Sequence, residues 1–244
     1  IQLSRYATVD GVLTTFNLAA LLGCVQLVFS EGKRGKLLTA IMAGLSLSTK
    51  ISSLSLALPI GLSLVLACGV RTFWKQRTFW LTGLFMLLVA VVVSVVTQPY
   101  AVLDYETFRA HTTEQVNMVR GLWRPPYVIQ YERTTPYLYH LGEMLRYTVG
   151  APVFLAAVAG ALLLLRAMFS RLDKGWFVVL VWTAAVFLIV GRYQVKFPRY
   201  FLPLYPVIML LAAYALSQLA EWCKARAMGA WAHVPATLVL LLSA

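Results

Sequence analysis

Long apolar runs constrain this chain more than any other feature of its sequence. A helix needs about 20 apolar residues to cross a hydrocarbon core about 30 Å thick. Six runs meet or approach that length: Gly11–Ser30, Ile51–Val70, Phe79–Gln98, Val149–Leu165, Trp176–Gly191 and Tyr200–Ala220. A further run, Ala230–Ala244, is still apolar at the last residue. The pattern predicts an all-α protein, built as a polytopic transmembrane helix bundle.

The composition agrees with a membrane protein. Of the 244 residues, 60% are hydrophobic and only 12% are charged, whereas a soluble domain has about 45–50% apolar and about 25% charged residues. The net charge of +12 needs no nucleic acid partner, because membrane proteins concentrate Lys and Arg in cytoplasmic loops. Cys24, Cys68 and Cys223 show no zinc-ligand spacing, so we expect isolated small apolar side chains.

The two ends of the sequence carry no terminal signals. Residue 1 is Ile, and no charged segment or cleavage site precedes Gly11, so no signal peptide is predicted. The last apolar run reaches the final residue. We therefore expect residues 1–244 to form a single transmembrane domain that is truncated at both ends.

The short basic loops predict the orientation. Basic residues favour the cytoplasmic side, and they gather in four loops: Lys33, Arg34 and Lys36; Arg71, Lys75 and Arg77; Arg166, Arg171 and Lys174; Lys224 and Arg226. The chain then begins outside, and residues 99–148 form a long extracytoplasmic loop. Within it, Asp104–Arg120 has no helix-breaking residue and predicts an amphipathic surface helix, followed by an ordered loop over Gly121–Pro136.

In this orientation Leu38–Val70 begins and ends on the cytoplasmic side, so it must cross the membrane and return. Two helices broken at Ser48-Thr49-Lys50 would cross and return. The first of them, Leu38–Thr49, spans only about 18 Å as a helix. A break at membrane depth is tolerated where it lines a cavity or is buried in protein. Lys50 is then expected near the outer surface or in a water-filled cavity.

Two charged residues stand at the outer boundary. Asp10 directly precedes the first apolar run. A carboxylate at the membrane boundary usually faces a water-filled cavity or a partner, and Arg5, five residues earlier, is a possible partner. The alternative role of Asp10 is to interact favourably with the helix dipole. Lys50 suits an ammonium group aimed at an anion in the cavity, and the alternative is a side chain that snorkels to the interface.

The loop Arg192–Arg199 is the exception to the orientation rule. It places Arg192, Lys196 and Arg199 on the outer side, next to Tyr193 and Tyr200. Arginine binds phosphate through its planar fork and lysine acts as a point charge, so the loop suits a lipid phosphate. The alternatives are general headgroup contact and an interfacial aromatic belt.

The long outer loop also carries polar side chains that suit a sugar or a polar acceptor: Gln130, Tyr131, Glu132 and Arg133. The alternative is a folded loop that packs on the membrane domain. His111 and His140 are expected on the surface. No nucleophile-elbow, Walker A or zinc-protease motif is present in the sequence.

Several segments resemble one family. SRYATVDGVLTTF (Ser4–Phe16) is similar to the acidic-mouth helix of GT-C superfamily glycosyltransferases, in particular family 39, which includes protein O-mannosyltransferases and lipid A aminoarabinose transferases. AGLSLSTKISSLSLALP (Ala43–Pro59) resembles their helix break, and VKFPRYFLPLYP (Val195–Pro206) their basic loop and following helix. QPYAVLDYETF (Gln98–Phe108) and VRGLWRPPYVIQY (Val119–Tyr131) resemble the outer loop of prokaryotic members.

The resemblance implies an integral enzyme of a prokaryotic plasma membrane, with its site facing outside. Such enzymes pass a sugar from a polyprenyl-phosphate donor to a protein, lipid or glycan acceptor. It implies that the principal catalytic acid precedes residue 1 and that Asp10 is a second acid, which orients the acceptor or helps to hold a divalent metal ion. A divalent metal ion is the only cofactor that the resemblance suggests, and members of the family differ in whether they use one. Lys50, Arg192, Lys196 and Arg199 match positions that the family has near the donor phosphate. From the residues themselves we add Tyr200 to that phosphate site and expect Arg5, Tyr131, Glu132 and Arg133 to bind substrate.

A second function class stays open. A transporter or flippase of lipid-linked substrates also uses broken helices and boundary cations. It should place charged groups near the bilayer midplane, whereas the unexplained charges here gather on one face. That distribution favours an outward-facing enzyme. A non-catalytic assembly subunit is the third alternative.

Overall fold

The computed structural model describes residues 9–30 and 32–225. Within them the chain is helical and contains no strand, as the apolar runs predict. Six helical segments are long and apolar enough to cross a membrane: Val9–Phe29, Ile51–Cys68, Arg77–Thr97, Ala151–Ser170, Lys174–Gly191 and Pro198–Ala225. The predicted run Ala230–Ala244 lies outside the described residues. The all-α prediction is therefore confirmed, and the six helices are consistent with an integral membrane protein.

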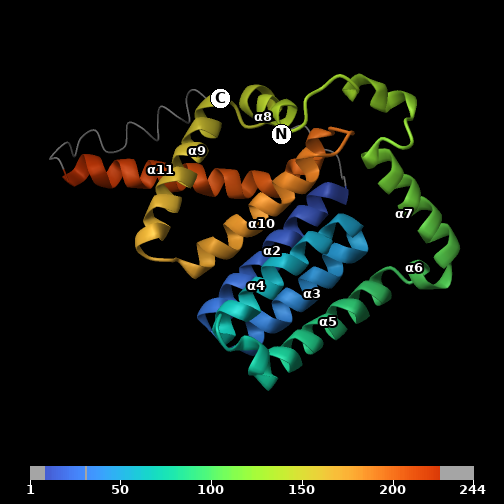
Figure 1. Cartoon of the computed structure of the whole chain (residues 1–244), viewed down its shortest axis with the longest axis horizontal. Helices are drawn as coiled ribbons and strands as arrows, with labels where there is room; N and C mark the ends of the chain where they lie inside the picture. Colours follow the sequence, from blue (N-terminus) through green and yellow to red (C-terminus); the bar gives the residue numbers. More distant parts are fainter. Residues whose placement is uncertain (1–8, 31, 226–244) are drawn as a thin grey trace. The chain divides into compact units, whose positions relative to one another are not determined.

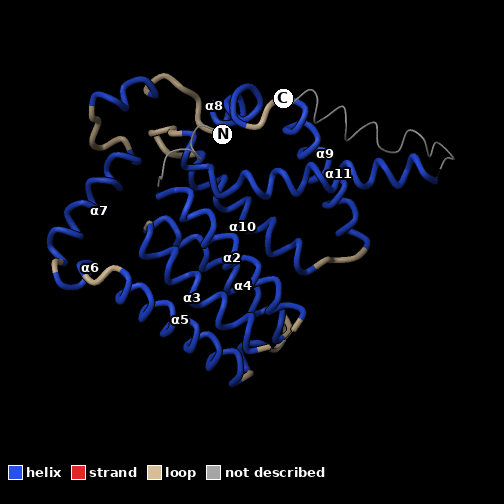
Figure 2. Tube along the Cα trace, turned by 180° about the vertical axis from the view of Figure 1, so that it is seen from behind, coloured by secondary structure: helices blue, strands red, loops and turns tan. Residues whose placement is uncertain are grey.

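The chain divides into two compact units. The first comprises Ile1–Arg133 and Asp173–Pro203, and the second comprises Thr134–Leu172 and Leu204–Ala244. Figure 1 and Figure 2 show the helices of each unit from opposite sides. The candidate site described below lies wholly within the first unit.

Closely packed helices form the first unit: α2 (Val9–Phe29), α3 (Lys33–Thr49), α4 (Ala57–Cys68), α5 (Arg77–Thr97) and α10 (Lys174–Gly191). Helix α2 packs on α3, α4 and α10, and α5 packs on α3. Small residues allow these approaches. A Cβ atom on Gly44 would stand 2.6 Å from the Ala90 carbonyl oxygen, so the α3–α5 contact depends on glycine, as is common between membrane helices.

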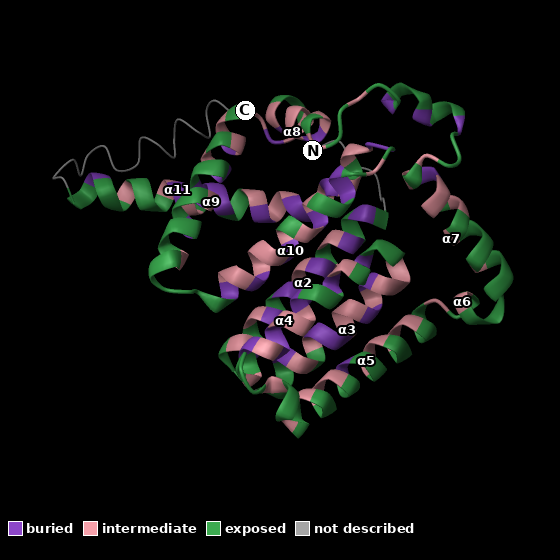
Figure 3. Ribbon diagram, in the orientation of Figure 1, coloured by how far each residue is buried: buried purple, intermediate pink, exposed green. Residues whose placement is uncertain are grey.

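Helix α5 has the character of a lipid-facing element. Met86 is its only buried residue, and Figure 3 shows exposed positions along much of its length. The exposed side chains include Trp80, Leu87 and Val96. A helix that is apolar on every face suits a membrane span, whereas in water such a surface would promote association.

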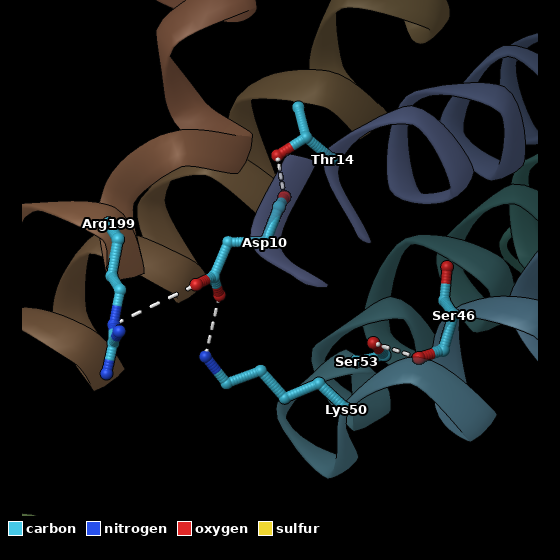
Figure 4. Close-up of polar contacts among 6 residues, drawn as sticks. All are labelled: Asp10, Thr14, Ser46, Lys50, Ser53 and Arg199. Atoms are coloured by element: carbon cyan, nitrogen blue, oxygen red, sulfur yellow. Dashed lines mark hydrogen bonds and ion pairs between the residues drawn. The ribbon is translucent and has the colours of Figure 1, made fainter. Parts of the chain in front are cut away.

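The helix break at Lys50 is present. Helix α3 ends at Thr49, and Lys50 is extended with φ −162° and ψ 131°. A 3-10 turn, η1 (Ile51–Leu56), then leads into α4. The Ser46 carbonyl oxygen accepts from the Lys50 N–H at 3.0 Å and from the Ser53 hydroxyl at 2.8 Å, which satisfies backbone groups that the break exposes (Figure 4). In a membrane protein a helix break is tolerated where its backbone groups are satisfied within the protein.

The segment after the break returns along the same bundle. Leu64, late in α4, shares one buried cluster with Ala40, early in α3, and with Leu27, near the end of α2. Helices α3 and α4 therefore fold back on one another as a hairpin, while the predicted crossing to the outer side and return stays a prediction. The first of the two helices begins at Lys33, five residues before the apolar stretch predicted from the sequence. The prediction began too late because its criterion, an apolar run, leaves out a basic first turn. Helix α3 is thus about 25 Å long.

Three helical segments follow α5 within the first unit: α6 (Tyr100–Leu103), α7 (Tyr105–Arg120) and the 3-10 turn η3 (Pro126–Tyr131). Helix α7 matches the predicted helix Asp104–Arg120. Asp104 caps it by accepting from the Thr107 N–H at 3.4 Å. Gly121 ends it with φ 77°, a left-handed conformation that glycine adopts without strain. The Gln194 N–H donates to the Val119 carbonyl at 2.9 Å, which joins the end of α7 to the basic loop.

The second unit is built mainly on α9 (Ala151–Ser170) packed against α11 (Tyr205–Ala225). A short helix α8 (Leu138–Glu143) and a π-helical turn η4 (Met144–Thr148) precede α9. His140 in α8 is 2% exposed, so its predicted surface position is wrong. The surrounding sequence gives no periodic signal for the buried face of so short a helix. The 3-10 turn η5 (Pro198–Leu204) precedes α11.

Candidate functional site

Asp10, in the first turn of α2, meets two cations from distant parts of the sequence. Its Oδ1 lies 2.8 Å from the Lys50 Nζ, and its Oδ2 lies 3.9 Å from the Arg199 Nε. Figure 4 shows both cations directed at the one carboxylate. The Thr14 hydroxyl donates to the Asp10 carbonyl at 2.7 Å and closes the first helical turn. The structure thus brings together three of the predicted site residues.

Lys50 and Arg199 also contact aromatic rings through cation–π interactions. The Lys50 Nζ lies 4.5 Å from the centroid of the Tyr200 ring, and the Arg199 guanidinium lies 4.7 Å from that of Phe197 and 5.9 Å from that of Tyr200. These are cation–π distances. Tyr193 stands edge-on to Tyr200 at 6.0 Å, and burial raises the pKa of the Tyr193 hydroxyl, so it stays a neutral donor. We call Asp10, Lys50, Arg199 and Tyr200 the Asp10 cluster.

The charge of the cluster favours an anion. Two cations and one carboxylate leave one positive charge in excess. The Lys50 side chain is 32% exposed and that of Arg199 is 46% exposed. Each cation keeps N–H groups beyond the one that faces Asp10, since an ammonium has three and a guanidinium five. The cluster can therefore bind the oxygens of a phosphate without releasing Asp10.

A cavity of about 1090 Å³ adjoins the cluster. Asp10, Lys50, Tyr193 and Tyr200 form part of its wall, together with residues of α2, η1, α5, α7 and α10. Most of the remaining wall is apolar. A large apolar volume beside a few convergent polar groups is the usual form of a ligand site.

Helix α7 contributes one face to the cavity. The residues of that face recur at helical spacing: Thr107, Phe108, His111, Thr112, Gln115, Val116 and Val119. This face carries both polar and apolar side chains, so this wall can contact both a polar group and a lipid chain. The predicted amphipathic helix is therefore part of the site wall.

Two residues inside the apolar spans carry polar atoms without a partner. Asn17 is 3% exposed and Trp182 is fully buried, and both line the cavity. The Asn17 Oδ1 and the Trp182 Nε1 have no hydrogen-bond partner among the described residues. Such a group costs about 1–3 kcal/mol. Sequence reasoning missed both residues, although an Asn within an apolar run was a signal, because polar groups at membrane depth are usually functional.

The other cations of the predicted phosphate site lie elsewhere. Lys196 is fully buried, and its Nζ donates to the Gln194 carbonyl at 3.3 Å. Burial lowers the pKa of its ammonium group. Arg192 is exposed and does not line the cavity. Arg5 lies outside the described residues.

The predicted substrate residues of the long loop do not line the cavity. Tyr131 is buried edge-on against Phe197, with ring centroids 5.7 Å apart. The Glu132 carboxylate pairs with Arg124 at 3.3 Å in an exposed ion pair. Arg133 is exposed. Tyr131 therefore supports the basic loop through Phe197, the ring on which the Arg199 guanidinium lies.

The side chains at Asp10 do not suit a divalent metal ion. Within residues 9–30 and 32–225, no group of three or more His, Cys, Asp or Glu residues is arranged to hold one. The two groups nearest the Asp10 carboxylate are cations, which repel a metal ion.

Replacing Lys196 by methionine should leave binding of a lipid phosphate unchanged within about twofold, because its ammonium lies outside the Asp10 cluster. The variant should also be more stable at neutral pH, since it removes a buried charge. Burial lowers the folded pKa below the ordinary value of 10.5, so wild-type stability rises as pH approaches 10.5, and the advantage of Lys196→Met should vanish there. Unfolding midpoints at several pH values test this, and a midpoint difference that grows with pH would contradict it.

Comparisons with protein-family models, with curated proteins and with solved structures find no match to this chain.

Proposed function

We propose that the chain is part of a membrane glycosyltransferase of the GT-C type, which transfers a sugar from a polyprenyl-phosphate donor to a protein, lipid or glycan acceptor on the outer face of a prokaryotic plasma membrane. The observation that carries the proposal is the Asp10 cluster, with its excess positive charge beside a large apolar cavity. A polyprenyl-phosphate sugar has the matching parts: an anionic phosphate and a long apolar chain.

The chemistry of the transfer explains why cations are needed. The acceptor oxygen bonds to the sugar C1, the bond from C1 to the phosphate oxygen breaks, and its electron pair stays on the phosphate. Cations placed where that charge develops stabilise the transition state. Lys50 and Arg199 fill this role in the proposal. The phosphate must lie within hydrogen-bond reach of their free N–H groups.

Asp10 acts as a positioning residue in this proposal. Each of its oxygens faces a cation, so it fixes Lys50 and Arg199 rather than offering a free oxygen to the acceptor. The acceptor proton goes to another carboxylate, which the family resemblance places ahead of this sequence. A resting carboxylate between two cations also keeps them close together while no phosphate is bound.

A transfer assay tests the proposal. The protein is reconstituted in liposomes with a labelled polyprenyl-phosphate sugar and candidate acceptors, and the labelled product is measured. Asp10→Asn should lower the rate about 10- to 100-fold, because it weakens two charge-assisted contacts worth about 1.5–3 kcal/mol together. Asp173→Asn is the matched control. Asp173 caps α10 by accepting from the Trp176 N–H at 3.0 Å, and asparagine caps a helix equally well.

Two outcomes would count against the enzyme. Movement of the labelled lipid across the bilayer without any transfer would favour a transporter or flippase. A transfer rate unchanged by Asp10→Asn would remove the Asp10 cluster from the mechanism.

A further inference from the structure

We propose that a second, polar pocket of the first unit binds the phosphate of an anionic phospholipid headgroup, with Lys36 as its cation. The pocket has a volume of about 290 Å³ and lies where α2 and α4 end and α3 and α5 begin. Leu27 in its wall stands 17 residues beyond Asp10 on α2, which is about 25 Å along the helix axis. This Lys36 pocket is therefore separate from the Asp10 cluster, and it does not depend on the proposed transfer.

Four helix ends form the wall of the Lys36 pocket. Figure 1 shows the end of α2 and the start of α5 at the same end of the bundle. Leu27 and Leu64 supply apolar surface, as members of one buried cluster. Gln76 ties the turn between α4 and α5 to the end of α4, because its Nε2 donates to the Cys68 carbonyl at 2.6 Å. The pocket is thus built by packed elements rather than by a single exposed turn.

Lys36 is the cation of this wall, and it is only partly exposed. Its ammonium group makes no hydrogen bond or ion pair with any residue that the structure describes, whereas Lys50 and Lys224 each pair with a carboxylate. A lysine that is partly removed from water without a partner is unfavourable. An anion bound in the pocket would remove that cost.

Two hydroxyls of α5 complete the polar wall. Thr78 and Thr82 are four residues apart, so they lie on one face of the helix, and both line the pocket. Neither hydroxyl makes a hydrogen bond with a described residue. The Thr97 and Thr183 hydroxyls, in contrast, donate to the carbonyl four residues earlier at 2.7 and 2.8 Å. The two free hydroxyls and the Lys36 ammonium are all hydrogen-bond donors.

Aromatic side chains place this pocket at the level of the lipid headgroups. Trp74 and Trp80 are exposed, and the Trp80 Nε1 donates to the Trp74 carbonyl at 3.0 Å. Phe79 stands edge-on to Trp80, with ring centroids 5.1 Å apart, and packs against the buried cluster of Leu27 and Leu64. Exposed tryptophans next to an apolar span are typical of the membrane interface. The apolar surface of α5 begins beside the pocket, so an acyl chain can lie along it while the headgroup enters the pocket.

The charge around the pocket selects an anionic headgroup. The segments 30–36 and 69–78 carry six cations and one acid, Glu31, which lies outside the described residues. Basic pockets between transmembrane helices bind the headgroups of anionic lipids. A zwitterionic headgroup brings its own ammonium group, which these cations repel. The donors of Lys36, Thr78 and Thr82 match the acceptor oxygens of a phosphodiester.

The experiment measures binding of phosphatidylglycerol and of phosphatidylcholine to the detergent-solubilised protein, at about 0.15 M salt to screen distant surface charges. Wild type should bind phosphatidylglycerol more tightly. Lys36→Gln should weaken that binding about tenfold, because a charge-assisted hydrogen bond is lost, and Lys36→Arg should retain most of it. Lys33→Gln is the matched control. Lys33 is exposed on the same helix and does not line the pocket, so its effect should stay within about twofold.

A second pair of variants tests the hydroxyls. Thr82→Val keeps the shape of the side chain and should weaken phosphatidylglycerol binding about fivefold, as expected for one neutral hydrogen bond. Thr97→Val is its control on the same helix. Its hydroxyl is already bonded to the Val93 carbonyl and lies outside the pocket, so lipid binding should not change.

The outcomes separate a specific pocket from a merely basic surface. Equal loss from Lys33→Gln and Lys36→Gln would overturn the pocket in favour of general attraction to anionic lipid. No loss from Lys36→Gln, or equal binding of the two lipids by wild type, would also overturn it. Displacement of the lipid by inorganic phosphate at the same concentration would overturn the headgroup as the ligand. Loss of phosphatidylglycerol binding in Lys36→Gln, with binding of polyprenyl phosphate unchanged, supports a site separate from the Asp10 cluster.

Discussion

Replacing Lys50 and Arg199 together by glutamine should weaken binding of polyprenyl phosphate about a hundredfold. A hydrogen bond to a charged group contributes about 1.5–3 kcal/mol. Both side chains are partly exposed, 32% for Lys50 and 46% for Arg199, and solvent screens them. We therefore expect the lower limit, about tenfold for each cation. Lipid binding to the detergent-solubilised variants measures the effect.

Two control variants accompany this measurement: one retains the positive charge at position 50, and the other removes a different cation from the loop that carries Arg199. Lys50→Arg keeps the charge and should retain most of the binding. Arg192→Gln removes a cation from the same loop as Arg199, but Arg192 lies outside the Asp10 cluster, whose carboxylate faces Lys50 and Arg199, so its effect should stay within about twofold. If Arg192→Gln weakened binding as strongly as Arg199→Gln, general attraction by a basic loop would explain the binding, and the cluster would have no special role.

Replacing Gly160 by alanine should destabilise the second unit by about 2–3 kcal/mol. A Cβ atom at this position on α9 would collide with the Leu211 backbone carbonyl on α11. Backbone atoms cannot move aside as a flexible side chain can, so the two helices must separate. Overpacking of this kind typically costs about 1–3 kcal/mol, and close helix approach in membranes depends on small residues. The denaturant midpoint of the solubilised protein measures the loss.

Gly61→Ala is the matched control for this prediction. Gly61 lies within α4, and no heavy atom stands within 4 Å of the position that its Cβ would take. Alanine favours helix over glycine by up to about 1 kcal/mol, so this variant should be neutral or slightly more stable. Equal destabilisation by Gly160→Ala and Gly61→Ala would show that the α9–α11 contact is looser than the structure has it.

The sequence predicted the elements of this fold well because the membrane simplifies the problem. Backbone groups in lipid must pair within a helix, so apolar length alone predicts most spans. The break at Lys50 followed from the orientation of the basic loops. Helix α7 was predicted almost to the residue, since no helix-breaking residue lies between Asp104 and Gly121. Helix starts such as Lys33 were missed, because hydropathy cannot detect a basic first turn.

The site was predictable only in part. Asp10, Lys50 and Arg199 each stood out as a charge at the membrane boundary, which is costly without a partner, and the structure pairs them with one another. The sequence could not separate Arg199 from Lys196, three residues earlier on the same loop. Which of the two reaches Asp10 depends on tertiary packing: Phe197 supports the Arg199 guanidinium, while Lys196 is buried at the Gln194 carbonyl.

In the proposed function, a lipid phosphate binds between Lys50 and Arg199. A structure of the protein with a polyprenyl-phosphate sugar bound would show whether it does. We predict phosphate oxygens about 2.7–2.9 Å from the Lys50 Nζ and from a guanidinium nitrogen of Arg199, as in charge-assisted hydrogen bonds, with Asp10 still paired. A phosphate bound instead at Arg192, or a lipid chain running past Asp10 with its phosphate elsewhere, would contradict this account.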